Sequence, residues 1–211
     1  MKQYDVILAD CPWRFEDKLD AMKRPVHRSA DSHYDTLTVG DIKCLDVQSL
    51  AKKSGCLLAL WVPSTFLPVG LEVMNAWGFA FKTTYIWVKL KRDHEKETDV
   101  NKKTRVGMGR LFRGAHEMCL LGTCGDSVYK KMTDHAQRSV MFDLNLGHSR
   151  KPAGLHKSLD KIFDGPDIDK CELFARRAYP GWDTYGNELD GKDIRDVLVM
   201  NTCEELGVPV S

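Results

Sequence analysis

Tyr4-Asp5-Val6-Ile7-Leu8-Ala9-Asp10-Cys11-Pro12-Trp13 begins with a short apolar run and ends with an acid, a proline and an indole. The apolar run predicts a buried strand. Pro12 restricts its own φ and favours an extended Cys11, so the Asp10 carboxylate and the Cys11 carbonyl can both point beyond the strand end. Ligands bind at the carboxyl ends of strands in open α/β sheets. Two acceptors beside the flat face of Trp13 therefore suit a planar ligand with an amino group, such as adenine.

The same residues also fit an ordinary strand end. In that alternative, Asp10 caps the following turn and Trp13 belongs to the core. Four residues do not separate the two interpretations, so the other segments of the chain have to distinguish them.

The composition predicts one globular domain over residues 1–211, because 211 residues with 43% hydrophobic and 29% charged content can form one sizeable core. No apolar run approaches the roughly 18 residues of a membrane-spanning helix. We therefore expect a soluble, cytoplasmic protein that does not associate with membranes. The seven cysteines form no C-x-x-C pair, and His116-Glu117 has no second histidine four residues on. Zinc ribbons, redox motifs and zincin metalloproteases are excluded on this basis, and no metal is expected.

Basic residues are concentrated in two irregular stretches, at about 14–35 and 89–113, although the formal net charge is only +1. Loops of this length in a compact domain are usually functional or disordered. A solvated surface is the alternative for each stretch, but we favour substrate contact for the two together.

Strands and helices alternate along the rest of the chain. Further strands are predicted at 55–62, 79–88, 116–121, 138–142 and 171–175, and helices at 66–77 and at 152–163, where a proline stands at the start. The segment 55–88 reads as a β-α-β unit, and a last helix is expected within 193–205. This alternation predicts an α/β fold with a parallel or mixed sheet and helices on its faces.

Nine segments, in order along nearly the whole chain, resemble the MT-A family of adenine N6-methyltransferases, named after the catalytic subunit of the eukaryotic mRNA adenosine methyltransferase. Asp10-Cys11-Pro12-Trp13 is similar to the family's Asp-Pro-Pro-Trp catalytic motif, with Cys11 in place of the usual proline. The other similar segments are 33–37 (HYDTL), 58–62 (LALWV), 76–79 (AWGF), 86–89 (IWVK), 113–117 (RGAHE), 148–152 (HSRKP), 172–176 (ELFAR) and 181–188 (GWDTYGNE).

The resemblance implies a Rossmann-like, S-adenosylmethionine-dependent methyltransferase fold with a mixed, mostly parallel sheet and helices on both faces. Because the catalytic motif precedes the cofactor half, the motif order resembles the permuted β-class. Carried over by position, the catalytic residues are Asp10, Cys11, Pro12 and Trp13, and the cofactor-binding residues are Asp10, Lys151, Leu173, Phe174, Arg176, Asn187 and Glu188. Taken singly, Arg176 fits a surface residue and Asn187-Glu188 a plain turn. Trp61, Trp77 and Trp87 are assigned to packing.

The resemblance also implies the reaction. The Asp10 carboxylate and the Cys11 carbonyl would accept the two hydrogens of the adenine amino group and free its lone pair for attack. The candidate substrate-binding residues are Trp13, Arg14, Phe15, Tyr34, Lys89, Lys91, Arg105, Arg110, Arg113, His116 and Glu117. DNA is the preferred partner because short stand-alone chains resemble the prokaryotic or phage members. An RNA methyltransferase and an inactive nucleic-acid-binding subunit remain alternatives, and a homodimer or a methyltransferase-like partner is expected by analogy alone.

Overall fold

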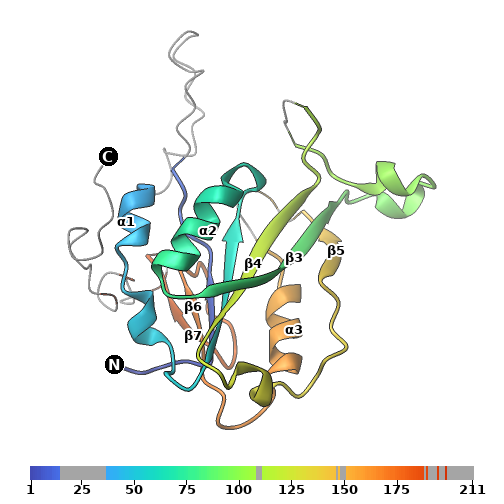
Figure 1. Cartoon of the computed structure of the whole chain (residues 1–211). Coiled ribbons are helices and arrows are strands. Elements are labelled where there is room, and N and C mark those ends of the chain that lie inside the picture. The colour runs from blue at the N-terminus through green and yellow to red at the C-terminus, as the bar shows by residue number, and fades with distance from the viewer. Residues whose placement is uncertain are drawn as a thin grey trace.

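A computed structural model describes residues 1–14, 37–107, 111–145, 147, 151–187, 189, 194 and 198. Its centre is one sheet with helices against both faces (Figure 1). The strands of the described part are β1 (Val6–Ala9), β2 (Cys56–Val62), β3 (Ala80–Leu90), β4 (His116–Cys124), β5 (Val140–Leu144), β6 (Lys170–Leu173) and β7 (Asp183–Tyr185). The α-helices are α1 (Val39–Lys43), α2 (Leu67–Ala76) and α3 (Gly154–Ile162).

β4 runs against its neighbours, whereas the other described strands share one direction. The order across the sheet is β5-β3-β4-β2-β1-β6-β7. β1 pairs in parallel with β2 and β6, and β4 pairs antiparallel with β2 and β3. Val88 pairs with His116, and Val62 pairs with Met118, so β4 starts where β2 and β3 end. The start of β4 and the carboxyl ends of the other strands therefore lie along one edge, called the carboxyl edge below.

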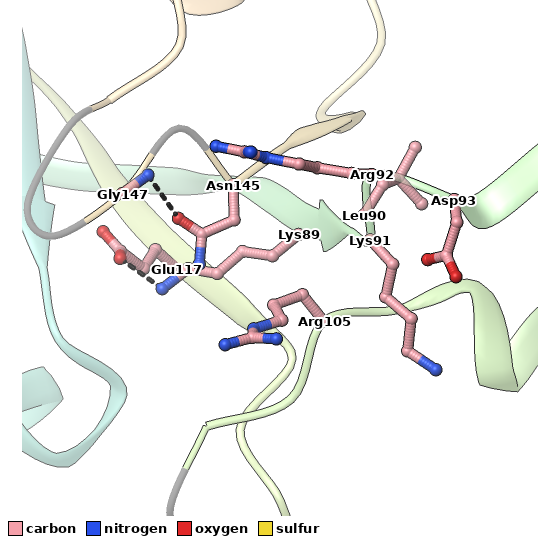
Figure 2. Close-up of a pocket in the computed structure, with 9 residues that line it drawn as sticks. All are labelled: Lys89, Leu90, Lys91, Arg92, Asp93, Arg105, Glu117, Asn145 and Gly147. Atoms are coloured by element: carbon pink, nitrogen blue, oxygen red, sulfur yellow. Dashed lines mark hydrogen bonds and ion pairs between the residues drawn. The ribbon is translucent and has the colours of Figure 1, made fainter.

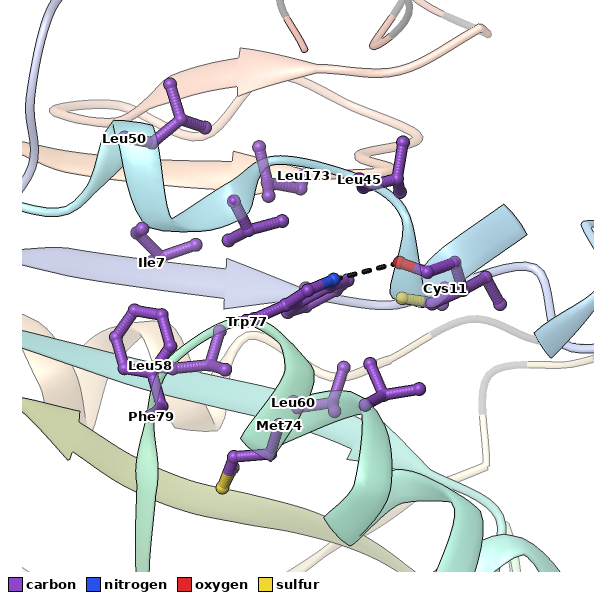
Figure 3. Close-up of a cluster of buried hydrophobic side chains, with 14 of the residues drawn as sticks. Ile7, Cys11, Leu45, Leu50, Leu58, Leu60, Met74, Trp77, Phe79 and Leu173 are labelled. Carbon is purple, nitrogen blue, oxygen red and sulfur yellow. Dashed lines mark hydrogen bonds between the residues drawn. The ribbon is translucent and has the colours of Figure 1, made fainter. Parts of the chain in front are cut away.

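The alternation of side chains along each strand divides the core into two layers. Ile7 and Ala9 pack on the side of α1 and α2, whereas Val6 and Leu8 pack on the side of α3. Because both faces are covered, β1 and β2 are buried at every position, which explains their continuous apolar sequences. Figure 3 shows the α2 side, where the indole N–H of Trp77 donates to a backbone carbonyl of the α1 helix at 2.8 Å.

The predicted strands correspond to β1 to β6, and the two predicted α-helices to α2 and α3, with shifted ends. The predicted β-α-β unit is right in direction but wrong in adjacency, because β4 lies between β2 and β3. β7 and α1 are not among the predicted elements, because they are too short for a clear hydrophobic period. Of the helix expected within 193–205, the described residues Ile194 and Leu198 are buried, and the Leu198 N–H donates to the Ile194 carbonyl at 2.9 Å. The loop expected at 14–35 lies outside the described residues, apart from its first.

Asp5 fixes the beginning of β1 through a buried ionic cluster. Its side chain is 2% exposed and accepts hydrogen bonds from Lys52 and Lys131, both at 2.6 Å, and from the Asp169 backbone N–H at 2.9 Å. These contacts join β1 to the segments that precede β2 and β6 and to the turn η7 (Val128–Lys131). They hold the sheet together at the end opposite to the carboxyl edge.

The connection between β3 and β4, residues 91–115, stands out from the body of the molecule (Figure 1). Its arms are tied together, because the Lys89 N–H donates to the Ala115 carbonyl at 2.9 Å and the Gly107 N–H to the Gly114 carbonyl at 2.7 Å. It also contains the 3-10 turns η5 (His94–Lys96) and η6 (Val100–Lys103). The stretch predicted as an irregular basic loop is therefore built, in its described part, from short turns and paired arms. No helix in the described ranges is long and apolar enough to span a membrane.

Candidate active site

Asp10, the first residue after β1, forms an ion pair with Lys151, which precedes α3. The Lys151 Nζ lies 2.8 Å from Oδ1 and 2.9 Å from Oδ2 of Asp10. Each side chain is 17% exposed. Pro12 lies two residues after Asp10, just beyond the end of β1. Pro152 directly follows Lys151 and precedes α3. The two charges are thus held at the carboxyl edge with little access to water.

Glu117 and Lys89 extend this pair into a row of four alternating charges. The Lys151 Nζ lies 3.3 Å from Oε2 of Glu117, and the Lys89 Nζ lies 2.5 Å from Oε1 of the same carboxylate. The Lys151 ammonium also lies over the Trp61 ring, 5.7 Å from its centroid. The row runs from the end of β1, by way of Lys151 and the start of β4, to the end of β3. It is called the charge row below.

The alternation of the strands explains why these side chains share one face. Asp10 lies two residues after Leu8, and Lys89 lies two residues after Trp87; both apolar side chains pack on the α3 side. Glu117 faces the same side, because it pairs with Trp87 and lies two residues before Cys119, which also packs on the α3 side. The reversed direction of β4 brings Glu117 to the carboxyl edge. An ordinary sheet pattern therefore assembles a charged cluster from three strands and the segment before α3.

Burial and neighbouring charges shift the pKa values of Asp10, Glu117 and Lys151. Burial raises the pKa of Asp10, and the Glu117 charge adds to this increase, whereas the Lys151 and Arg176 cations oppose it. Burial by itself also raises the pKa of Glu117, but Lys151 and Lys89 outweigh it and hold the pKa below its usual value. Burial lowers the pKa of Lys151, but the two carboxylates outweigh it and raise the pKa. Burial and the neighbouring cations therefore act on the Asp10 pKa in opposite directions.

Cys11 contributes its backbone to this edge and its side chain to the core. The thiol packs on the α2 side (Figure 3), where Cys11 is 4% exposed and burial raises its pKa well above the usual value. The Cys11 carbonyl accepts the Trp13 N–H at 2.9 Å. A carbonyl oxygen has a second lone pair, so it can accept one more hydrogen.

The burial of Trp13 contradicts one prediction. Its indole is 6% exposed, its N–H donates to the Trp61 carbonyl at 3.1 Å, and its ring packs against Phe66. The alternation that turns Asp10 toward α3 turns Trp13 toward α2. The expected open stacking face beside Asp10 is therefore wrong for this structure, and Trp13 belongs to the core. The packing roles predicted for the other three tryptophans, Trp61, Trp77 and Trp87, are confirmed by their burial.

The ends of β6 and β7 complete the carboxyl edge beside β1. Leu173 is buried in the core, so its side chain is not exposed to a ligand there, and its carbonyl accepts the Asp10 N–H at 3.3 Å. Phe174 follows with a φ of 61°, a left-handed conformation that non-glycine residues adopt mainly at constrained, often functional positions. After β7, a Cβ on Gly186 would lie 2.0 Å from the Ala175 carbonyl oxygen. The backbone at this end is therefore tightly constrained.

The other predicted cofactor residues are only partly placed. Arg176 lies near enough to lower the pKa of Asp10, and Asn187 is exposed just beyond β7. Glu188 lies outside the described residues.

A pocket of about 660 Å³ opens beside the charge row, between the ends of β3 and β5 and the base of the 91–115 connection (Figure 2). Its lining residues are Lys89, Leu90, Lys91, Arg92, Asp93, Arg105, Glu117, Asn145 and Gly147. Figure 2 shows the Lys89 side chain in the middle, joined to Glu117, with Arg92 and Arg105 on either side. The lining carries four cations and two carboxylates, so the pocket suits an anionic group.

Four predicted substrate residues, Lys89, Lys91, Arg105 and Glu117, line this pocket. Arg92 and Asn145 also line the pocket but are not among the predicted substrate residues. Arg92 stood in the basic stretch without a distinguishing signal, whereas Asn145 follows a predicted strand and could have been found by asking which polar residues stand at strand ends.

Of the remaining predicted substrate residues, those that the structure describes do not line the pocket. His116 faces the α2 side, where its Nε2 lies 3.3 Å from Ser64 Oγ. Arg14 and Arg113 are exposed. The predictions for Phe15, Tyr34 and Arg110 lie outside the described residues. Within the described ranges, no group of three or more His, Cys, Asp or Glu residues is arranged to bind a metal ion.

Comparisons with known proteins place the chain among methyltransferases. The family model described as MT-A70 matches residues 4–188, which include every described strand. The chain is 29% identical over 209 residues to the Mycoplasma protein named "Type II methyltransferase M.MunI", covering 92% of this chain and 81% of the relative. It is 26% identical over 201 residues to the human "N(6)-adenosine-methyltransferase catalytic subunit METTL3", covering 94% of this chain and 30% of the relative.

A plant relative matches in a similar way. The chain is 28% identical over 191 residues to the Arabidopsis thaliana "N(6)-adenosine-methyltransferase MT-A70-like", covering 89% of this chain and 24% of the relative. The chain thus spans most of the length of the Mycoplasma relative and less than a third of the human and plant relatives.

Proposed function

Because the chain belongs to the MT-A70 family of methyltransferases, we propose that it methylates the N6 amino group of adenine in DNA and uses S-adenosylmethionine as the methyl donor. The observation that carries this proposal is the position of Asp10. Its carboxylate lies at the carboxyl edge, directly before the Cys11 carbonyl and in ion-pair contact with Lys151. This is the place and the motif at which the family resemblance puts catalysis.

The chain's own residues account for activation of the amine. The nitrogen of an adenine amino group is a poor nucleophile, because its lone pair is delocalised into the ring. The Asp10 carboxylate and the Cys11 carbonyl accept its two hydrogens, which draws the nitrogen toward tetrahedral geometry and frees the lone pair. Lys151 opposes the effect of burial on the Asp10 pKa and favours the ionised form, which is the form that accepts hydrogens. Positioning and fixed charges then provide most of the rate enhancement.

The residues at the carboxyl edge fit S-adenosylmethionine. This cofactor supplies an electrophilic methyl group when it is bound. Asp10 and Lys151 offer opposite charges for the ammonium and the carboxylate of its amino-acid part, and the ends of β6 and β7 lie next to β1. The constrained backbone at Phe174 and Gly186 has the form of a preformed ligand edge. Arg176, Asn187 and Glu188 are proposed for the ribose and the adenosine.

DNA is proposed as the substrate on two grounds. The basic pocket beside the charge row suits the phosphates of a nucleic acid. The chain also spans most of a relative named as a type II methyltransferase, but less than a third of the human adenosine methyltransferase subunit. RNA methylation is the other candidate function, because that human relative is named for adenosine methylation.

A product assay tests the proposal. The protein is incubated with S-adenosylmethionine and unmethylated duplex DNA, single-stranded DNA or RNA, and N6-methyladenine is quantified in the nucleoside digest by mass spectrometry. Asp10→Asn, which keeps the size of the side chain but removes its charge, should reduce kcat by at least about a hundredfold. Asp126→Asn is the matched control, because Asp126 is exposed beyond the far end of β4.

Each outcome has a distinct meaning. N6-methyladenine in DNA that depends on Asp10 supports the proposal, and product in RNA alone replaces DNA as the substrate. Calorimetry with S-adenosylmethionine covers the remaining case, in which no product forms. Binding without product then indicates a missing partner, and absence of binding indicates an inactive, nucleic-acid-binding subunit.

A further inference from the structure

Leu111 and Phe112 are unusually exposed for large apolar side chains. Leu111 is 92% exposed and Phe112 is 89% exposed, and both exceed every other large hydrophobic residue in the described part of the chain. Single exposed apolar residues are common on protein surfaces and need no explanation. Two adjacent exposed apolar side chains on a projecting segment do need an explanation, because the fold buries neither of them.

The two residues lie in the segment between Gly107 and Gly114, whose backbones are joined by a hydrogen bond at 2.7 Å. The arms of the 91–115 connection run together from the carboxyl edge, held by the bond from the Arg105 N–H to the Lys89 carbonyl at 2.6 Å and by the bond between Gly107 and Gly114. Figure 1 shows that the connection extends away from the sheet and its covering helices. The apolar pair is therefore carried at a distance from the body on a support whose base is fixed beside the charge row.

The described part of the connection carries more cations than carboxylates, although Asp93, Glu95, Glu97 and Asp99 also lie in it. Arg113 directly follows the apolar pair, and Arg105 stands on the opposite arm. Arg105 also lines the basic pocket, together with Lys91 and Arg92. Cations along the support and two exposed apolar side chains match a nucleic-acid duplex, which has phosphates outside and stacked bases inside. Two side chains are too small a surface for a stable protein interface, which buries much more area.

A duplex substrate presents a problem that such a projection solves. The amino group of adenine is paired within the duplex, whereas Asp10 lies at the sheet edge with only 17% of its side chain exposed. Enzymes that act on a base take it out of the stack, and apolar side chains inserted at a base step help to unstack it. We propose that Leu111 and Phe112 form an apolar wedge that enters the duplex beside the target adenine while the basic pocket holds the backbone. This inference rests on the proposed function.

Fluorescence tests the wedge without any need for catalysis. The five native tryptophans are all buried, between 0% and 7% exposed. Phe112→Trp therefore adds one exposed reporter to the segment between Gly107 and Gly114, and Val100→Trp adds a matched reporter on the same projection, where the native side chain is 68% exposed. Each variant is titrated with a duplex of random sequence at low salt, and binding is followed separately by anisotropy of a dye on the DNA.

The wedge predicts that bound duplex quenches the new emission in Phe112→Trp, because an inserted indole stacks on bases, and leaves the emission of Val100→Trp largely unchanged. Bound duplex without quenching overturns the wedge, and so does failure of the wild-type protein to bind duplex at all. Equal quenching of both reporters also overturns it, since that result indicates general proximity to DNA.

A second measurement uses the methylation reaction on the DNA sequences that the wild-type protein modifies. Leu111→Ala/Phe112→Ala should lower kcat/KM on a matched duplex by at least about tenfold and on a duplex mismatched at the target adenine by less than about twofold, because a mismatched base is easier to extrude. Equal losses on both duplexes overturn the wedge. Product without quenching rejects the wedge alone, whereas quenching without product rejects the proposed function and leaves the wedge in place.

Discussion

The Lys151 ammonium lies within 2.9 Å of both carboxylate oxygens of Asp10, although 141 residues separate the two in the chain. Asp10 directly follows β1 and Lys151 precedes α3, so the ion pair joins two distant segments of the chain at the carboxyl edge. Glu117 contacts the same ammonium from the other side. Lys151 and Glu117 thus act on the charge of Asp10 in opposite directions, and each can be changed separately.

The acid limb of the pH–rate profile should move in opposite directions when these two neighbours are neutralised. Protonation of Asp10 removes an acceptor, so kcat falls as the pH falls through its pKa. Lys151→Met removes a cation that lowers the Asp10 pKa, so activity should be lost at a higher pH than in the wild type. Glu117→Gln removes an anion that raises the Asp10 pKa, so activity should persist to a lower pH.

The measurement is kcat against pH at saturating S-adenosylmethionine, because Lys151 is also a proposed cofactor residue. Shifts of the same sign in both variants, or an unmoved acid limb, would show that Asp10 is not the titrating group.

Removing a cation from the basic pocket should lower the affinity for DNA and make that affinity less dependent on the salt concentration. Each phosphate contact contributes about −0.9 to the slope of log K against log salt. Arg92→Gln and Arg105→Gln should each make the slope less negative by about that amount per lost contact. Lys53→Gln is the control, because Lys53 is exposed before the start of β2, at the opposite edge of the sheet. Slopes equal to that of the wild type would place the DNA elsewhere.

Asp5→Asn should destabilise the protein by roughly 3 kcal/mol, because it removes a buried charge from two lysines. Burial alone raises the pKa of Asp5, but the hydrogen bonds from Lys131 and Lys52 outweigh it and lower the pKa. This stabilisation is therefore complete above the unfolded-state pKa of about 4 and is lost as the pH falls toward the lower folded-state pKa.

Urea unfolding at several pH values measures this effect. The free energy of unfolding of the wild type should approach that of Asp5→Asn as the pH falls below about 4. A constant difference between the two across this range would contradict the assignment. Asp126→Asn, an exposed control, should unfold like the wild type.

Gly186→Ala should disturb the edge formed by β6 and β7. The new Cβ would lie 2.0 Å from the Ala175 carbonyl oxygen, so the backbone has to move. Overpacking of this kind costs about 1–3 kcal/mol. The affinity for S-adenosylmethionine, measured by calorimetry, should fall as well. Gly165→Ala is the matched control, because the nearest atom to its Cβ is Ile168 Cγ1 at 3.5 Å, an ordinary contact. Unchanged affinity in Gly186→Ala would separate this edge from the cofactor.

Elements with a strong local pattern could be predicted from the sequence. β1 and β2 are continuous apolar runs because they are covered on both faces, and α2 is framed by a proline at its start and a glycine after its end. β7 could not be found in this way, because it has three residues and is specified mainly by pairing with β6. α1 is also short, although the capping box of Thr38 and Asp41 marks its start.

The site was predicted unevenly, because a motif names residues without giving their orientation. Asp10, Lys151 and Glu117 were each named, but their joining into one row with Lys89 depends on β4 being inserted antiparallel, which the alternation of elements does not reveal. Trp13 was misjudged for a related reason. Three residues beyond Asp10, it continues the opposite side of the pleat and enters the core.

The antiparallel insertion of β4 also divides this region into paired strands, whose register is fixed, and the 91–115 connection, whose length and sequence are less constrained. β3 and β4 are locked in register by strand pairing, and Lys89 and Glu117 stand where that pairing meets the 91–115 connection. Length and sequence can therefore vary beyond this point while the register and the charge row stay in place. We therefore expect that replacing the connection with the corresponding segment of a relative leaves the register of β3 and β4 and the Lys89–Glu117 ion pair in place.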